Sequence, residues 1–327
     1  MGSFYARIAG NNHPETGMPT NAVLMPASVG EEYKKLYSNP SRIVSVGELG
    51  SAYRAFDPSA GGQVIDNMQL RVSQDRFDDR RALLSSLDGL RRRADASDAL
   101  AGVDDIKRQA FDVIMGGVSS AFDLSKEDPR TLEMYDTGEF TIPKAVLKKK
   151  RNTTPQFSPV ALGKQMLMAR RLCEAGCGFV TVSSSGWDMH GNAFGIDDGI
   201  ACLGPAVDKA VSAFLTDLHQ RGMSDKVLLV VTGEFGRTPK INKKAGRDHW
   251  GNLCPLLFAG GGLNMGQVIG ASDRRVSVPA TDPVGVSDML ATIMHSLFDI
   301  GQLRIQRGVP ANILRAVNTG APIPQLV

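Results

Sequence analysis

Five consecutive apolar residues, Val227 to Val231, constrain the fold more than any other feature of this sequence. A strand without polar alternation is typical of a parallel sheet that is covered on both faces. Other strand-like runs after Pro159 alternate with amphipathic helical patterns, and this alternation indicates an α/β fold. The predicted elements are strands at residues 22–25, 42–46, 179–182, 227–231 and 256–259, and helices at residues 161–175, 203–218 and 287–298.

The chain has 327 residues, a length that fits one or two domains. We expect one α/β domain over residues 1–327, with a helical and loop excursion at residues 78–158. Apolar residues at helical spacing between residues 78 and 122 predict a helical hairpin within this excursion. The basic run from Lys148 to Arg151 is open to two interpretations: a solvated surface loop, or a contact for phosphate, membrane or nucleic acid.

Charge and composition exclude several classes of protein. With 37 Lys and Arg against 34 Asp and Glu, the net charge is only +3, too weak a field for a nucleic-acid binder driven by bulk charge. No apolar run approaches the roughly 18 residues that a membrane span needs, so no span is predicted. The four cysteines show no metal-binding spacing and are expected to be free, buried thiols: Cys173, Cys177, Cys202 and Cys254.

Three polar clusters lie near the ends of predicted strands, where functional groups collect in parallel sheets. They are residues 186–191, 233–239 and 246–251. Their carboxylates and imidazoles are the donors that divalent metals take from converging loops. The candidate metal ligands are Asp188, His190, Glu234, Asp248 and His249.

Each cluster also has a structural interpretation. Asp188 could cap a turn, Glu234 could pair with Arg237, and Asp248 and His249 could form a surface turn. The other histidines, His13, His219 and His295, are expected to be structural or surface residues. The sequence has neither a GxxxxGK[ST] phosphate loop nor a GxSxG elbow.

At these clusters the sequence resembles a known family. The strings GWDMHGN, LVVTGEFGRTPKINKKAGRDHWGN and LLFAGGGLNMGQVIGASD resemble the domain-of-unknown-function 1501 proteins, which are similar to the alkaline phosphatase and sulfatase superfamily. The resemblance runs from about residue 40 to 300 and is most specific over residues 178–273. It implies a doubly wound, mostly parallel, alkaline-phosphatase-like sheet, with the helical hairpin as an insertion.

The resemblance also implies a two-metal hydrolase site. Asp188, His190 and His249 would bind one ion, and Glu234, with Asp248, would serve the second. Arg237 or Arg247 would face a phosphate or sulfate group, which suits a guanidinium fork. The cofactors would be one or two divalent ions, Zn or Mn, and the partner a small anionic ester.

One part of the family pattern is expected to be absent. In the superfamily a first strand supplies a metal-binding carboxylate and is followed by a Ser or Thr nucleophile, and no such segment stands upstream here. The catalytic nucleophile is therefore left unassigned, and an N-terminally incomplete chain is expected. Relatives are often exported, so a full-length parent would be periplasmic or extracytoplasmic, whereas the localisation of this chain stays open.

Three functions follow from these observations. The first is a metal-dependent hydrolase of phosphate or sulfate esters, or an incomplete remnant of one. The second is a non-catalytic metal- or anion-binding module of the same fold. The third is an interaction protein without a metal. The sequence leaves the oligomeric state open.

Overall fold

The structure is a computed structural model, and it describes residues 1–38, 45–59, 72–73, 75–80, 82–83, 118–149, 155–191 and 195–327. Its strands are β1 (Asn21–Leu24), β2 (Phe179–Val182), β3 (Leu228–Thr232), β4 (Gly236–Arg237), β5 (His249–Trp250) and β6 (Leu256–Gly260). Its α-helices are α1 (Gly2–Ala9), α6 (Pro129–Met134), α7 (Lys144–Lys149), α8 (Leu162–Glu174), α9 (Ile196–Gln220), α10 (Val286–Leu297), α11 (Ile300–Ile305) and α12 (Ala311–Thr319). Short 3₁₀ helices lie at Pro26–Val29, Glu31–Tyr33, Gly47–Leu49, Ser51–Tyr53, Val118–Phe122, Leu124–Lys126 and Pro155–Phe157.

Three predictions concern segments that are only partly described. The strand predicted at residues 42–46 lies mostly outside the described residues. Most of the helical hairpin predicted between residues 78 and 122 lies outside the described residues. The basic run begins at the end of α7, while its residues 150–151 also lie outside the described part.

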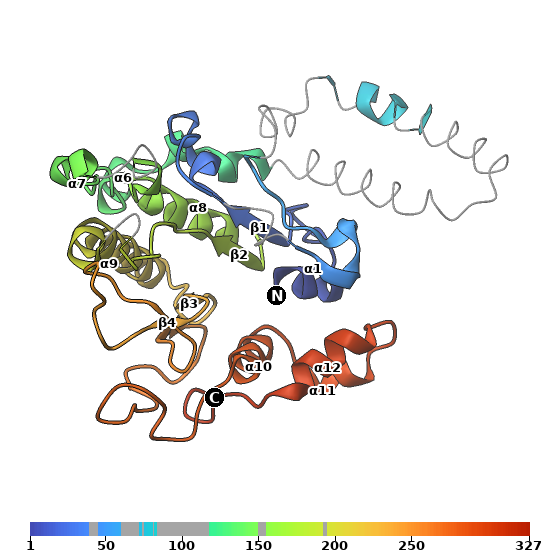
Figure 1. Ribbon diagram of the computed structural model, residues 1–327. Coiled ribbons are helices and arrows are strands. Elements are labelled where there is room, and N and C mark those ends of the chain that lie inside the picture. Colours follow the sequence, from blue (N-terminus) through green and yellow to red (C-terminus); the bar gives the residue numbers. More distant parts are fainter. Residues whose placement is uncertain are drawn as a thin grey trace.

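Helix α8 and strand β2 form where the sequence predicts them. Helix α8 buries Leu167, Met168 and Leu172 almost completely. Gly176, just past its end, has the positive φ of 102° that favours glycine. Strand β2 follows at once and pairs in parallel with β1, from Asn21↔Phe179 to Leu24↔Val182. Because α8 packs on both strands, a helix on a two-stranded parallel sheet forms the centre of the main core (Figure 1).

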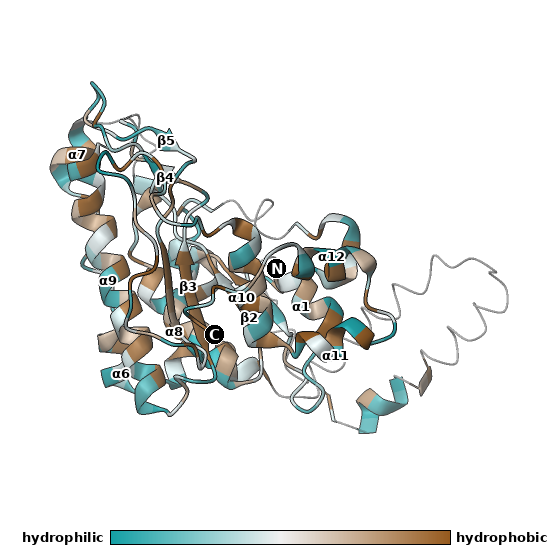
Figure 2. Cartoon of the chain, turned by 90° about the horizontal axis from the view of Figure 1, so that it is seen from below, coloured by the Kyte–Doolittle hydropathy of each residue, from teal (hydrophilic) through white to brown (hydrophobic). Residues whose placement is uncertain are grey.

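Helix α9 packs against α8 and confirms the helix predicted at residues 203–218. It buries Ala206, Ala210 and Phe214 in the core, and Figure 2 shows apolar and polar residues alternating along it. Its length and its mean hydropathy of 1.2 over 18 residues would let it cross a membrane, a test that core helices of soluble proteins also pass. In this fold the helix packs on α8, and 39% of that window is buried inside the protein.

The predicted doubly wound, mostly parallel, alkaline-phosphatase-like sheet is wrong. Among the strands of the described part, only β1 and β2 pair in parallel, whereas β3 pairs antiparallel with β6 and β4 pairs antiparallel with β5. Parallel neighbours need a crossover connection, usually a helix. Residues 233–255, between β3 and β6, contain the β4–β5 pair and no helix. The chain therefore returns beside β3 in the opposite direction, with Thr232 facing Leu256.

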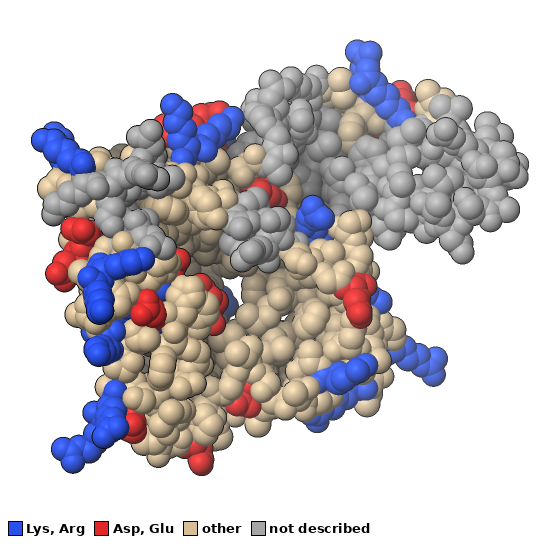
Figure 3. Space-filling model, in the orientation of Figure 1, with Lys and Arg blue, Asp and Glu red and all other residues tan. Residues whose placement is uncertain are grey.

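Helices α10, α11 and α12 form a second apolar cluster, which begins where the sequence predicts the last long helix. Its buried residues are Met294, Ile300, Leu303, Ile313 and Val317. Phe4 and Ile8 of α1 pack against it, so the N-terminal helix connects this cluster to β1. Figure 3 shows a hollow between this second cluster and the main core. On the face drawn there, Lys and Arg lie mainly along the edges, with Asp and Glu among them.

A buried ion network joins α8, α9 and the segment before α6. The Arg170 side chain is 1% exposed, and its guanidinium donates to Asp217 Oδ2 at 2.8 Å, to Glu174 Oε2 at 2.7 Å and to Glu127 Oε2. The Tyr135 hydroxyl donates to the same Asp217 oxygen at 3.1 Å. Burial, together with the charge of Asp217, raises the pKa of Tyr135, so this hydroxyl stays neutral and remains a donor.

The four cysteines are free, as predicted, but they are not all buried. Cys177 and Cys202 are buried and Cys173 is half-buried, whereas Cys254 is exposed. The prediction of buried thiols is therefore wrong for Cys254, which lies in the loop just before β6.

We predict that Arg170→Met lowers the free energy of unfolding by about 3–5 kcal/mol, because the substitution removes the most buried cation of the network and leaves the buried Glu127 and Asp217 carboxylates with only the more exposed Arg171 and Arg221 as cations. Urea unfolding followed by circular dichroism measures this loss. Arg130→Met, at an exposed position on α6, is the control and should change stability by less than about 0.5 kcal/mol. A loss of less than about 1 kcal/mol for Arg170→Met would show that the network contributes little.

Candidate metal centre

The candidate site is built from two loops. The first, which we call the β2 loop, is residues 183–191 and follows the end of β2. The second, the hairpin loop, is residues 236–250; it begins with β4 and ends with β5. Strands β4 and β5 pair in the register Gly236↔Trp250 and Arg237↔His249, so Arg237 and His249 lie side by side.

Three side chains from these loops converge on one point. His249 Nε2 lies 2.8 Å from Asp188 Oδ1, and His190 Nε2 lies 2.8 Å from Asp188 Oδ2. Each of the three residues offers one ligand atom, and these atoms all lie within 4.8 Å of one another. We call Asp188, His190 and His249 the Asp–His–His cluster. Two imidazole nitrogens and one carboxylate oxygen at this separation are a donor set that suits a divalent metal ion.

A cation already lies beside the cluster. The Arg237 guanidinium donates to Asp188 Oδ1 at 2.9 Å and lies over the Phe235 ring, 5.5 Å from its centroid. Partial burial alone would raise the pKa of Asp188, but hydrogen bonds from His249, Arg237 and His190 hold it below its ordinary value. The Asp188 carboxylate is therefore ionised at neutral pH, the state in which it can bind a metal.

The β2 loop is held in place by the buried side chain of Met189. Met189, between Asp188 and His190, is buried in an apolar cluster with Val146 of α7 and with Cys202 and Leu203 of α9. Helix α7 and the hairpin loop lie at the same end of the molecule (Figure 2). Because Met189 points into this cluster, the neighbouring Asp188 is presented to solvent: its side chain is 60% exposed, whereas that of His190 is 24% exposed.

The two loops touch through backbone atoms. The Arg247 backbone N–H donates to the Met189 carbonyl at 2.9 Å. Gly246 lies so close to the β2 loop that a Cβ added to it would be 2.4 Å from the carbonyl carbon of His190. Glycine at position 246 is therefore what lets the hairpin loop approach the β2 loop.

Three of the predicted site residues do not join the cluster. Glu234 is exposed and is not among the grouped ligand atoms of the described residues. Asp248 Oδ1 instead accepts a hydrogen bond from Asn242 at 2.8 Å. The Arg247 guanidinium donates to the backbone carbonyls of Thr238 and Pro239, so it braces the hairpin loop. The structure thus brings together Asp188, His190, His249 and Arg237.

Sequence reasoning missed two residues of this site. The Phe235 ring lies 4.4 Å from the His249 ring, centroid to centroid, and supports both His249 and Arg237. Asn242 bonds to both loops. An aromatic residue two positions before Arg237 and an asparagine in a Lys-rich turn are weak signals, since neither carries chemistry by itself.

The remaining histidines lie elsewhere, as the sequence predicts. His13 Nδ1 accepts from the backbone N–H groups of Glu15 and Thr16 in a turn. His219 is exposed near the end of α9, and His295 is exposed on α10.

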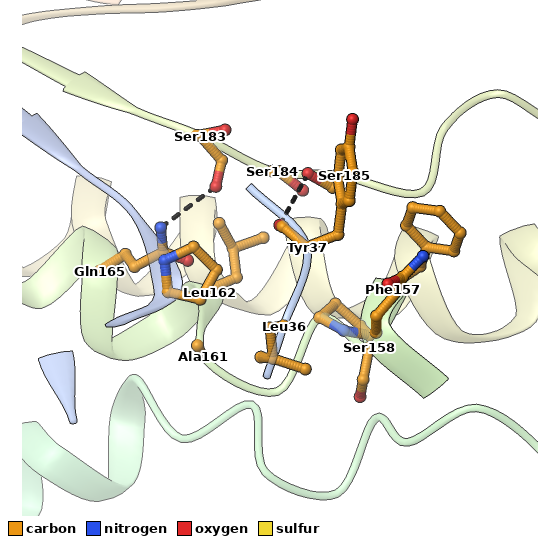
Figure 4. Close-up of a pocket in the computed structure, with 13 residues that line it drawn as sticks. Leu36, Tyr37, Phe157, Ser158, Ala161, Leu162, Gln165, Ser183, Ser184 and Ser185 are labelled. Atoms are coloured by element: carbon orange, nitrogen blue, oxygen red, sulfur yellow. Dashed lines mark hydrogen bonds between the residues drawn. The ribbon is translucent and has the colours of Figure 1, made fainter. Parts of the chain in front are cut away.

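A small pocket opens where β2 ends (Figure 4). It is lined by Ser183 to Ser185, Tyr37 and the start of α8. The Gln165 side chain donates to the Ser183 carbonyl at 3.1 Å, and the Ser185 hydroxyl donates to the Tyr37 carbonyl at 3.2 Å. These polar groups bond to one another, and no residue of the Asp–His–His cluster lines the pocket.

Fold and site together define a protein of mixed helices and strands that presents two imidazoles and a carboxylate on adjoining surface loops. A family model described as "Protein of unknown function (DUF1501)" matches residues 1–304. Because this match covers most of the chain, the protein belongs to the DUF1501 family, and the family resemblance stated above is confirmed. No curated protein and no solved structure gives a significant match. The similarity to the alkaline phosphatase superfamily and the absence of an N-terminal segment stay predictions.

We predict that Gly246→Ala separates the two loops and so lowers metal affinity at the cluster by at least about tenfold, the usual effect of disturbing the support of metal ligands. Isothermal titration with Zn²⁺ measures the change. Gly251→Ala is the matched control, because a Cβ there meets no atom within 4 Å. Equal affinities in the two variants would show that the close approach at Gly246 is not needed.

Proposed function

We propose that this protein is a metal-dependent hydrolase of phosphate or sulfate esters that works at the Asp–His–His cluster. The observation that carries the proposal is the convergence of three ligand atoms within 4.8 Å, with the Arg237 guanidinium 2.9 Å from Asp188. The choice of phosphate or sulfate esters as the substrate class rests on the predicted similarity of the DUF1501 proteins to alkaline phosphatases and sulfatases.

The residues present fit a single divalent ion. Asp188, His190 and His249 would hold it, and their mixed oxygen and nitrogen donors suit Zn or Mn. A bound ion would supply Lewis-acid stabilisation of negative charge on the ester oxygens. The second ion implied by the family resemblance has less support, since Glu234 and Asp248 lie outside the ligand group found among the described residues.

Arg237 is the residue of this site that would bind the anionic group of the substrate. Its guanidinium can present a planar fork of N–H donors to a tetrahedral oxyanion while it stays over Phe235. Arg247 is a poorer candidate because its guanidinium donates to the backbone carbonyls of Thr238 and Pro239, whereas that of Arg237 donates to Asp188 of the cluster. The chain's own groups would thus orient the ester through Arg237, next to the three ligands.

The second candidate function is a non-catalytic metal- or anion-binding module. The observation that favours it is the openness of the site, since the side chains of Asp188 and His249 are 60% and 54% exposed. Enzymes usually bury most of a small substrate.

We predict that the purified protein binds about one equivalent of Zn²⁺ or Mn²⁺ and that His249→Ala lowers the bound metal to less than about a tenth, because one of three ligands is lost. Elemental analysis after dialysis measures metal per chain. His219→Ala, which removes an exposed histidine at the far end of α9, is the matched control and should keep its metal.

Assays of the metal-loaded protein with nitrophenyl phosphate and nitrophenyl sulfate then separate the two candidates. Turnover that is lost in His249→Ala supports the hydrolase. Bound metal without turnover supports the binding module. Wild-type protein without metal, even after Zn²⁺ and Mn²⁺ are supplied, contradicts the hydrolase and the metal-binding form of the module.

We predict that Arg237→Gln changes metal and anion binding in opposite directions. Removing a cation beside the ligands should tighten Zn²⁺ binding several-fold, since like charges repel. Inorganic phosphate should bind the Zn²⁺-loaded variant about tenfold more weakly, because charge-assisted hydrogen bonds are lost. Titration calorimetry measures both affinities, with Arg274→Gln, at an exposed position, as the control. Unchanged phosphate affinity would remove Arg237 from the anion site.

A further inference from the structure

The two histidines of the cluster come from different loops, so something must hold these loops in register. The loops approach closely at Gly246, but the backbone hydrogen bond beside it joins Arg247 to Met189 and not to either histidine. The side chain of Asn242, in the middle of the hairpin loop, bonds to His190 itself and to Asp248, the residue before His249. We infer that Asn242 is the positioning residue that sets His190 against His249, and this inference rests on the proposed function of the cluster as a metal site.

The amide nitrogen of Asn242 joins the two ligand-bearing segments. Its Nδ2 donates to the backbone carbonyl of His190 at 3.3 Å and to Asp248 Oδ1 at 2.8 Å. The first bond fixes the backbone of one metal ligand. The second fixes the residue that immediately precedes the other ligand, His249. One NH₂ group thus connects both sides of the site.

The amide oxygen of Asn242 shapes the turn from which this NH₂ group reaches out. Its Oδ1 accepts from the backbone N–H of Lys244 at 2.8 Å and of Gly246 at 3.1 Å. The backbone of Asn242 also bonds to Gly246, closing the turn. These two N–H donors identify the oxygen end of the amide, so the nitrogen end must face His190 and Asp248.

The same turn is tied to the helix that follows the β2 loop. Ala245 has a positive φ of 58°, which is uncommon for a residue other than glycine. Its carbonyl accepts from the backbone N–H of Ile196, the first residue of α9, at 2.9 Å. This hydrogen bond ties the turn that carries Asn242 to the start of α9. Because the turn is itself held in place, Asn242 can position other residues.

The four hydrogen bonds require an asparagine. Aspartate has the same shape and would keep both bonds to Oδ1, but it has no NH₂ donor. Its second oxygen would instead face the His190 carbonyl oxygen and the Asp248 carboxylate, and both contacts are repulsive. Asn242→Asp is therefore a variant that removes the donor half of the network and keeps the acceptor half.

Nuclear magnetic resonance tests the positioning without a metal. The chain has five histidines, and three of them, His13, His219 and His295, lie away from the cluster and are internal controls. In wild-type protein labelled at histidine, the His190 and His249 rings, whose centroids are 5.5 Å apart, should show cross-relaxation. In Asn242→Asp the cross-relaxation between His190 and His249 should disappear, while the resonances of the three control histidines should keep their positions. A retained His190–His249 signal would overturn the inference.

Zinc titration tests the consequence for the site. An added carboxylate alone would tighten binding of a cation, whereas lost positioning should weaken Zn²⁺ binding about 10–100-fold in Asn242→Asp, the usual effect of losing a group that orients metal ligands. Asn252→Asp is the charge-matched control, since the Asn252 side chain bonds to Ser277 and not to the β2 loop. Its affinity should stay equal or rise. Equal affinity of Asn242→Asp and wild type would overturn the inference.

A double variant separates stability from positioning. Asn242→Asp/Asp248→Asn restores a donor and an acceptor between positions 242 and 248 but not the bond to His190. It should recover most of the melting temperature lost in Asn242→Asp, while its Zn²⁺ affinity stays at least about tenfold below that of wild type. Full recovery of the affinity would show that the bond to His190 has no role.

The resonance experiment and the zinc titration together also distinguish this inference from the proposed function. Wild-type protein that shows the His190–His249 signal but binds no Zn²⁺ would refute the metal site. In that case the resonance comparison by itself decides whether Asn242 positions the two rings.

Discussion

The buried guanidinium of Arg170 is the interaction on which the arrangement of the main core depends. It carries one positive charge into the contact between α8 and α9, and it can remain there only because Asp217, Glu174 and Glu127 surround it. These partners come from α8 itself, from α9 and from the segment before α6. The geometry of the network therefore fixes how the two long helices pack. Helix α8 leads into β2, and α9 begins just after the β2 loop, so this packing also determines where the loop lies.

The candidate metal centre depends on a second constraint, the close approach of two surface loops. The antiparallel return of β6 beside β3 turns residues 233–255 into one long connection, and the hairpin loop lies within it. Gly246 allows the hairpin loop to reach the β2 loop, and Met189 holds the β2 loop down on α9. Since Asp188 bonds to both histidines and to Arg237, a small shift of either loop would separate the ligands. The geometry of the site therefore depends on the contact between these two loops.

Much of the local structure could be predicted from the sequence. The strands at Ala22, Phe179, Val230 and Phe258 and the helices that became α8, α9 and α10 form close to the predicted residues, because apolar periodicity and glycine at helix ends act over a few residues. The direction of β6 could not be predicted, because it depends on whether a connection of more than twenty residues folds into a helix. The assignment to the DUF1501 family followed from the motifs themselves.

For the site, the sequence by itself determined which residue types were available: a carboxylate and an imidazole two positions apart after β2, and a second imidazole and two arginines near β4 and β5. Only the tertiary structure decided which of them meet. It joined Asp188, His190, His249 and Arg237, turned Arg247 toward backbone carbonyls, and left Glu234 in solvent. The physical reason is that ligand geometry is set within a few ångströms by contacts between loops far apart in the chain, and residue spacing carries no information about those contacts.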